Sequence, residues 1–224
     1  MEKFQGKYRI SSTRLQNWDY ASCGIYFVTL CTKNREHYFG QIIKPETEKE
    51  HPIMKLSEIG RIVEAEWLKT PEMRLDMNLK LDEYQVMPNH FHAILIIGEN
   101  QFNNKESNDE SSENPDGRDA MPRVSIIIDS ISNSEHDRVF ELETRMISKT
   151  NMIHKNKFSP QSKNLASIMR GFKSAIKMYT LDNNIVFGWQ SRFYDHIIRD
   201  FDEYQRIAKY IRNNPDNWEN DTLH

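Results

Sequence analysis

The sequence predicts an α+β protein with a ferredoxin-like antiparallel sheet flanked by helices. Short runs rich in β-branched and aromatic residues alternate with amphipathic segments in the order β-α-β-β-α-β-α, and two of the runs are separated only by a Pro-Asn turn. Strands joined by so short a turn pair in antiparallel fashion. We therefore expect one domain over residues 1–224, with a long polar insertion at 99–163.

Each element is predicted from its own pattern. Strands are expected at residues 25–32, 80–87, 90–97 and 194–199, and amphipathic helices at 56–69, 165–181 and 201–213. The last helix has clear end signals. Asp200 is the expected N-cap, with Glu203 at the capping-box position, and Pro215 ends the helix because proline disfavours the α conformation in the residue before it.

The insertion differs in charge from the rest of the chain. Between Glu99 and Glu141 there are 11 acidic and 4 basic residues, a net charge of −7, so the other residues carry +4 of the total of −3. Few residues in its first part can be buried, and we expect that part to be flexible, whereas residues 124–131 fit either a strand or a short helix. A mildly basic body with an acidic insertion is compatible with DNA binding but does not require it.

The composition excludes several classes of protein. No apolar run reaches the roughly 20 residues of a transmembrane helix, the first residues lack the apolar core of a signal peptide, and no Walker-type glycine loop is present. The two cysteines, Cys23 and Cys31, are too few for a disulfide framework. We expect a cytoplasmic protein with no membrane partner and no nucleotide cofactor.

The sharpest local signal is a pair of histidines, His90 and His92, at the start of an apolar strand. Side chains two residues apart in a strand point to one face, roughly 7 Å apart along the chain, so both imidazoles can reach one divalent cation. Two polar residues at a junction between turn and strand would give the same pattern. The pair alone leaves both interpretations open.

Tyr210 and Asn214 lie one turn apart on one face of the last predicted helix. A tyrosine hydroxyl can attack a DNA phosphate when a metal lowers the charge barrier, and an asparagine oxygen can complete a metal site with the histidines. Asn213 is the competing ligand. A partly buried helix tyrosine followed by a C-terminal cap is the alternative.

Several segments of the chain resemble a known family. Residues 84–97 (YQVMPNHFHAILII) resemble the histidine segment of HUH single-strand endonucleases, and residues 188–218 (GWQSRFYDHIIRDFDEYQRIAKYIRNNPDNW) resemble the C-terminal signature of REP-associated tyrosine transposases, which are IS200-like. Residues 25–40 and 167–177 are similar to the same group. The insertion after the histidine strand is longer than in compact members.

This resemblance implies a transposase-type enzyme that nicks and rejoins single-stranded DNA. His90, His92 and Asn214 would hold Mg²⁺ or Mn²⁺, which polarises the scissile phosphate. Tyr210 would attack that phosphate, form a 5′-phosphotyrosine and release a 3′-OH. The substrate implied is single-stranded DNA with hairpin (REP-like) elements, and members of the family are monomers or homodimers.

Contacts to DNA are expected from the helix at 165–181 and the segment that follows it. The residues expected to make them are Arg170, Lys173, Lys177, Trp189 and Arg192. A charged run is more commonly a solvated face. The resemblance favours contact for Lys173 and Arg192.

Two other functions fit the same residues. A domesticated protein that binds DNA hairpins without cleaving them would not need the combined metal and tyrosine set. A hydrolytic phosphodiesterase that uses an activated water would release free product and tolerate the loss of Tyr210. If another tyrosine is the nucleophile, Tyr204 and Tyr194 are the next candidates.

Overall fold

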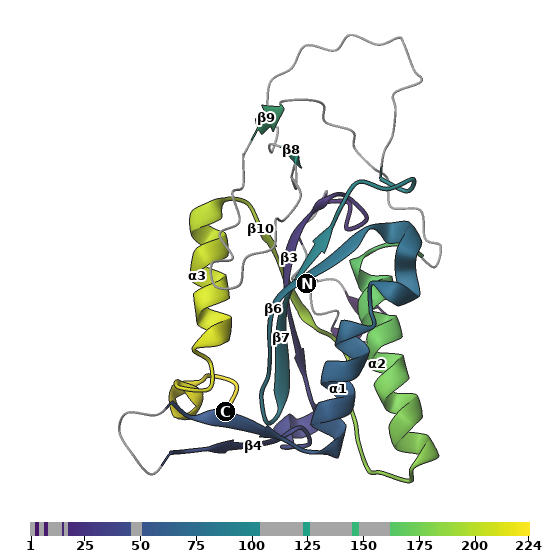
Figure 1. Cartoon of the computed structure of the whole chain (residues 1–224). Coiled ribbons are helices and arrows are strands. Elements are labelled where there is room, and N and C mark those ends of the chain that lie inside the picture. The colour runs from purple at the N-terminus through teal and green to yellow at the C-terminus, as the bar shows by residue number, and fades with distance from the viewer. Residues whose placement is uncertain are drawn as a thin grey trace.

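The centre of the molecule is a four-stranded antiparallel sheet (Figure 1). The computed structural model describes residues 15, 18–45, 51–103 and 162–224, together with the backbone of the short strands at 3–4, 7–8, 123–125 and 145–147. The sheet consists, in spatial order, of β10 (Tyr194–Ile198), β3 (Gly24–Cys31), β7 (His90–Ile97) and β6 (Leu79–Val86). The strand β7 lies between β3 and β6, as in a split β-α-β unit. The predicted α+β class is confirmed.

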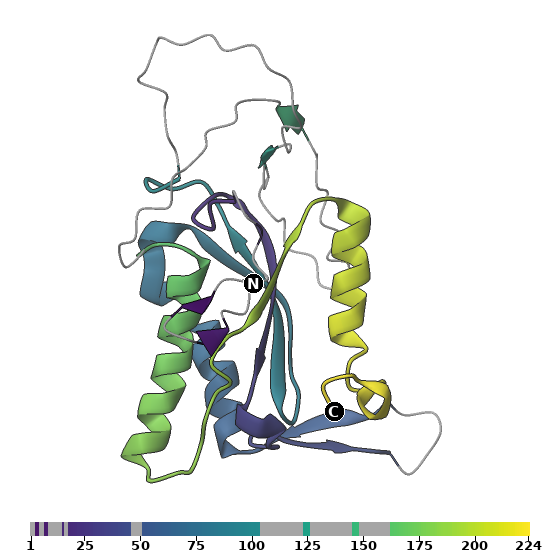
Figure 2. The ribbon, with the colours of Figure 1, turned by 180° about the vertical axis from the view of Figure 1, so that it is seen from behind.

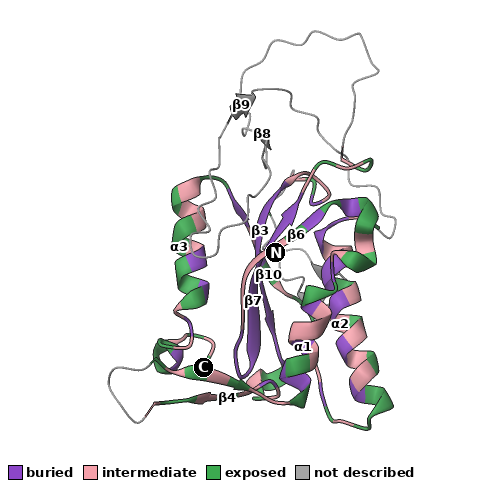
Figure 3. Cartoon of the chain, in the orientation of Figure 1, coloured by how far each residue is buried: buried purple, intermediate pink, exposed green. Residues whose placement is uncertain are grey.

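Two helices cover one face of the sheet. They are α1 (Glu58–Leu68) and α2 (Leu165–Asp182), which lie side by side in Figures 1 and 2. Their buried residues pack against the sheet, as the purple stripes in Figure 3 show. Trp67 of α1 is fully buried, with its ring 5.2 Å from that of Phe91 and 5.5 Å from that of Phe172. This layer is the larger part of the hydrophobic core.

The helix α3 (Phe201–Arg212) covers the opposite face (Figure 2). Ala208 and Ile211 are buried against Ile94 and Ile96 of β7. Neighbouring residues of a strand point to opposite faces, so His90 and His92 lie on the same side of the sheet as these isoleucines. The two histidines therefore point towards α3 and away from α1 and α2.

The predicted start of α3 is half right. Asp200 caps the helix by accepting a hydrogen bond from the Glu203 amide at 2.8 Å. The Glu203 carboxylate, however, accepts from the amide of Arg199 and lies 2.8 Å from His196 Nε2. The capping box is not formed, because the glutamate binds one residue earlier in the chain.

A hairpin and three short 3₁₀ helices were not predicted. The hairpin pairs β4 (Gly40–Ile43) with β5 (Ile53–Leu56), and the 3₁₀ helices are η1 (Lys33–Arg35), η2 (Glu72–Met77) and η3 (Trp218–Asn220). Leu56 belongs to β5, so α1 begins later than predicted. Gly40 has a φ of 138°, and a Cβ there would lie 2.1 Å from the Lys55 carbonyl oxygen, so the hairpin requires glycine at this position.

The remaining described strands are short pairs. The strand β1 (Lys3–Phe4) pairs with β2 (Lys7–Tyr8), and β8 (Arg123–Ser125) pairs with β9 (Arg145–Ile147). The predicted flexibility of the insertion, and most of 124–131, lie outside the described residues. Among the described residues, no helix combines the length and apolar character needed to cross a bilayer, and Cys23 and Cys31 are both free thiols.

Candidate metal and tyrosine site

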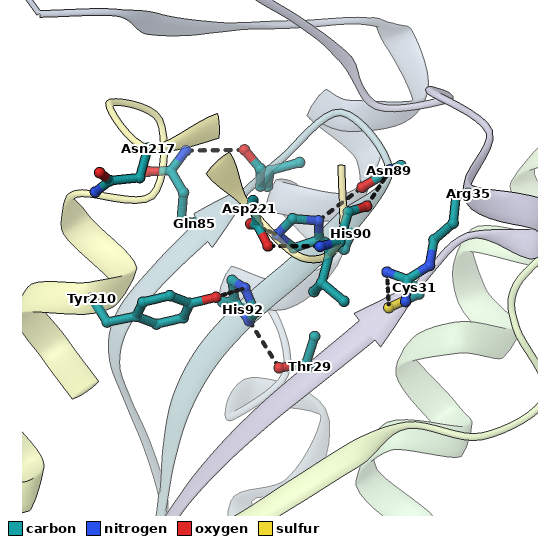
Figure 4. Close-up of polar contacts among 12 residues, drawn as sticks. Thr29, Cys31, Arg35, Gln85, Asn89, His90, His92, Tyr210, Asn217 and Asp221 are labelled. Atoms are coloured by element: carbon teal, nitrogen blue, oxygen red, sulfur yellow. Dashed lines mark hydrogen bonds and ion pairs between the residues drawn. The ribbon is translucent and has the colours of Figure 1, made fainter. Parts of the chain in front are cut away.

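The histidine pair lies at the start of β7, on the face that α3 covers. Cys31 and Thr29 of β3 are the register partners of His90 and His92. Both imidazoles are buried, and their ring centroids are 4.5 Å apart (Figure 4). The strand thus places two imidazoles side by side in the interior, as the spacing in the sequence predicts.

The last helix brings Tyr210 to this pair. Its hydroxyl oxygen lies 3.2 Å from Nε2 of His92, whose Nδ1 lies 2.8 Å from Thr29 Oγ1 (Figure 4). The tyrosine side chain is 44% exposed, so its phenol borders both the buried histidines and solvent. Burial raises the pKa of Tyr210, as does the nearby charge of Asp221, while the Asn214 amide opposes the shift. The phenol is therefore protonated at neutral pH.

Asn214 lies just beyond the end of α3 and turns its side chain inward. It is 1% exposed, and its backbone amide donates to the Ile211 carbonyl at 3.2 Å. Its side chain is close enough to both groups to oppose the effect of burial, which lowers the pKa of His90 and raises that of Tyr210. Asn213, the competing residue, is the C-cap of the helix.

Asp221 is the residue that the sequence did not reveal. It follows η3, in an irregular segment without periodicity or a recognisable motif. Its side chain is 3% exposed, and Oδ2 lies 3.5 Å from His90 Nε2. One ligand atom from each of His90, His92 and Asp221 can be chosen so that all lie within 4.8 Å of one another.

Contacts with other parts of the chain hold the segment that carries Asp221. Asp221 Oδ1 accepts from the Leu223 amide, and the Leu223 carbonyl accepts from Asn89 Nδ2, both at 2.8 Å. Lys44, which directly follows β4, also forms an ion pair with Glu219, two residues before Asp221. The carboxylate is thus positioned by backbone and side-chain contacts rather than by a helix or strand.

Three buried atoms at the site have no hydrogen-bond partner among the described residues: His90 Nε2, Asn214 Oδ1 and Asp221 Oδ2. Buried polar atoms without a partner are rare because each costs about 1–3 kcal/mol. An imidazole nitrogen, an amide oxygen and a carboxylate oxygen all offer lone pairs. A divalent cation would satisfy all three, since imidazole nitrogens suit transition-metal ions and amide and carboxylate oxygens suit Mg²⁺ and Mn²⁺. The residues present therefore fit a metal ion.

The neighbours of His90 fix its tautomer. Asn89 is fully buried and its Nδ2 donates to the Leu223 carbonyl, so its Oδ1 must face His90 Nδ1, 2.8 Å away. An amide oxygen only accepts, so Nδ1 carries the proton and Nε2 carries the lone pair. Burial lowers the pKa of His90 to about 4 and holds the pKa of His92 well below its usual value. Both imidazoles are neutral at pH 7, as metal ligands must be.

We predict that Asn89→Leu weakens binding of Mn²⁺ by roughly 10-fold to 100-fold, because His90 then loses the acceptor that orients its ring. Titration calorimetry on the variant and the wild type measures the change. Asn89→Asp keeps the acceptor for His90 Nδ1 but, like Asn89→Leu, loses the donor to the Leu223 carbonyl, so a higher affinity in Asn89→Asp than in Asn89→Leu assigns that difference to the contact with His90. Equal affinity in Asn89→Leu and wild type would show that this contact does not act on the metal site.

The residues predicted to contact DNA lie on α2 and on the segment after it. Arg170 and Arg192 are exposed. The Lys173 ammonium donates to the Gln190 carbonyl at 2.5 Å, and that of Lys177 donates to the Phe187 carbonyl at 2.8 Å. Trp189 packs against the core and lies 5.6 Å below the Lys173 ammonium. Their contact with DNA stays a prediction.

The fold and the site define a ferredoxin-like α+β protein with a histidine pair opposite a helix tyrosine. The chain is 30% identical over 214 residues to an uncharacterized protein of Haemophilus influenzae (strain ATCC 51907 / DSM 11121 / KW20 / Rd). The match covers 95% of this chain and 92% of that protein, so this chain belongs to the same family. No protein-family model matches it. A solved structure of a REP-associated tyrosine transposase bound to a REP hairpin is similar, with a TM-score of 0.43 and 15% identity over 92% of this chain and 73% of that one.

Proposed function

We propose that this protein is a single-tyrosine, metal-dependent enzyme of the HUH type that cleaves and rejoins single-stranded DNA beside hairpins. The observation that carries the proposal is the position of the Tyr210 hydroxyl, 3.2 Å from His92 and next to a cluster of buried lone pairs with no partner. A core tyrosine needs no such neighbours. The resemblance of the four sequence segments to REP-associated tyrosine transposases supports the same function.

The residues of the site divide the chemistry between them. His90, His92, Asn214 and Asp221 would hold the metal ion. When bound, a divalent cation offsets the negative charge of a scissile phosphate and so lowers the barrier to attack by an oxygen nucleophile. The proposal thereby includes Asp221, which the sequence prediction of His90, His92 and Asn214 did not.

Tyr210 is the proposed nucleophile. Its oxygen bonds to phosphorus, and the bond from phosphorus to the 3′ oxygen of the preceding nucleotide breaks. The products are a 5′-phosphotyrosine and a DNA strand whose 3′ oxygen has taken up a proton. Because the phosphotyrosine keeps the energy of the ester bond, a 3′-OH can reverse the reaction and rejoin DNA without a nucleotide cofactor.

The test is the formation of a covalent adduct. The protein is incubated with hairpin oligonucleotides that carry randomised single-stranded flanks, labelled at either the 3′ or the 5′ end, with Mn²⁺, Mg²⁺ or EDTA. We expect 3′-labelled DNA to migrate with the protein on a denaturing gel when a metal is present, and the 5′ label to remain on free DNA. No adduct in EDTA is expected, because the charge of the phosphate is then not offset.

Other outcomes would replace the proposal with one of its alternatives. Cleaved DNA with no protein-bound label indicates a hydrolytic phosphodiesterase. Binding of hairpins without cleavage in any metal indicates a non-cleaving DNA-binding protein.

A further inference from the structure

A cavity of about 520 Å³ opens beside the histidine site. It is lined by Lys33, Asn34, Arg35, Trp189, Gln190 and Ser191. The volume lies within the range of small-ligand sites, roughly 300–1,000 Å³, which is enough for a nucleotide unit. Its two walls come from η1, which follows β3, and from the segment between α2 and β10.

Backbone hydrogen bonds hold the two walls together. The Lys33 amide donates to the Gly188 carbonyl at 2.8 Å, and the Gln190 amide donates to the Cys31 carbonyl at 2.9 Å. Between these bonds Thr32 and Trp189 form an isolated antiparallel bridge. The pairing of the sheet thus continues beyond the end of β3 and fixes the two walls relative to each other.

The chemistry of the lining suits an anion. Lys33 and Arg35 are cations, and no carboxylate is among the lining residues. Asn34 and Arg35 have φ values of 56° and 60°, a left-handed conformation that asparagine tolerates but that costs an arginine about 1–2 kcal/mol. Backbone strain of this kind is concentrated at functional sites.

Arg35 links the cavity to the histidine site. Its Nη1 donates to Cys31 Sγ at 3.2 Å, and Cys31 is the register partner of His90 (Figure 4). A thiol is a weak acceptor, so the guanidinium keeps strong donors for another ligand. One side chain, Arg35, thus connects the lining of the cavity to the strand position that pairs with His90.

We propose that this cavity binds the DNA strand next to the scissile phosphate, with Lys33 and Arg35 on backbone phosphates and Trp189 against a sugar or base. This inference rests on the proposed function, because it takes single-stranded DNA as the ligand. It adds Lys33, Arg35 and the cavity itself to the residues predicted from the sequence. Neither Lys33 nor Arg35 takes part in the chemical step.

Binding of fluorescent oligo(dT) of 12 nucleotides, measured by anisotropy in EDTA across a series of salt concentrations, tests this proposal. Each phosphate contact on single-stranded DNA contributes about 0.7 to the log–log salt slope. We expect Lys33→Gln to bind roughly 3-fold to 10-fold more weakly near 100 mM salt and to lose about 0.7 of slope. Lys33→Gln/Arg35→Gln should lose about 1.4.

The matched control is Lys80→Gln. Lys80 is an exposed lysine of β6 that pairs with Ile96, at the end of the sheet away from His90, and its removal changes the net charge by the same amount. We expect it to leave affinity and slope unchanged. Equal slopes in Lys33→Gln and wild type, or equal losses in Lys33→Gln and Lys80→Gln, would overturn the proposal.

The assay separates this inference from the proposed function. It contains no metal and does not require Tyr210 to react. If the wild type forms no adduct but Lys33→Gln still lowers the slope, the cavity stands and the enzyme proposal fails. If the adduct forms and the slope does not change, the enzyme proposal stands and the cavity does not bind the strand. A wild type that binds no oligo(dT) overturns the cavity proposal.

Discussion

Tyr210→Phe is expected to reduce the covalent adduct at least roughly 10³-fold, because phenylalanine lacks the oxygen that attacks phosphorus. The change removes one oxygen atom and leaves the ring in place. The ring lies 5.2 Å from that of His92 and 6.3 Å from that of Phe27, and it should keep those contacts. Binding of a hairpin oligonucleotide should therefore survive. The adduct is measured on a denaturing gel and the binding by anisotropy.

Two other tyrosines provide sharp controls. Tyr194 lies on β10 in the same row as His92, with Thr29 between them, and is 50% exposed. Tyr204 lies two turns earlier on α3, where its hydroxyl donates to Asp82 at 2.7 Å. Phenylalanine at either position should leave the adduct in place. If Tyr210→Phe forms as much adduct as the wild type and Tyr194→Phe forms none, the nucleophile is Tyr194 of β10.

The parts of the site that lie on regular elements could be predicted from the sequence. The run at 90–97 is a strand in the structure with the predicted bounds, so the two-residue period places both histidines on one face. The helix at 201–213 is one residue shorter than predicted, and its apolar stripe alone fixes which side of α3 faces the sheet. Tyr210 lies beside that stripe, so its phenol reaches His92 while remaining partly exposed. Periodicity is therefore enough to place these three side chains.

Asp221 could not be predicted because nothing local determines its position. It lies in an irregular segment that two distant contacts hold, from Asn89 and Lys44. The β4–β5 hairpin was missed for a related reason, since its short strands form only a two-stranded sheet and their burial alternates weakly. Such elements depend on tertiary contacts more than on their own propensity.

Asp221→Asn is expected to change stability and metal affinity in opposite directions. In the metal-free protein the Asp221 carboxylate has a buried oxygen without a hydrogen bond, 3.5 Å from the His90 lone pair. An asparagine keeps the acceptor for the Leu223 amide and places an N–H donor opposite that lone pair. We expect the free energy of unfolding in EDTA to rise by about 1 kcal/mol, the usual contribution of one hydrogen bond.

The same substitution should weaken the metal site, because it removes a negative ligand and occupies the lone pair of His90. A metal ion at 100 times its dissociation constant stabilises the folded protein by about 2.7 kcal/mol, and a 100-fold loss of affinity leaves only about 0.4 kcal/mol at that concentration. Urea unfolding with Mn²⁺ and with EDTA measures both quantities.

Asp216→Asn, in the same segment but bonded to His51, should alter neither. If Asp221→Asn were less stable in EDTA and kept the full gain from Mn²⁺, the carboxylate would anchor the segment through Leu223 and would not be a ligand. If Asp221→Asn is instead more stable in EDTA and gains less from Mn²⁺, a purely structural role for Asp221 is excluded. Replacing a residue that only holds the segment in place would lower stability, not raise it.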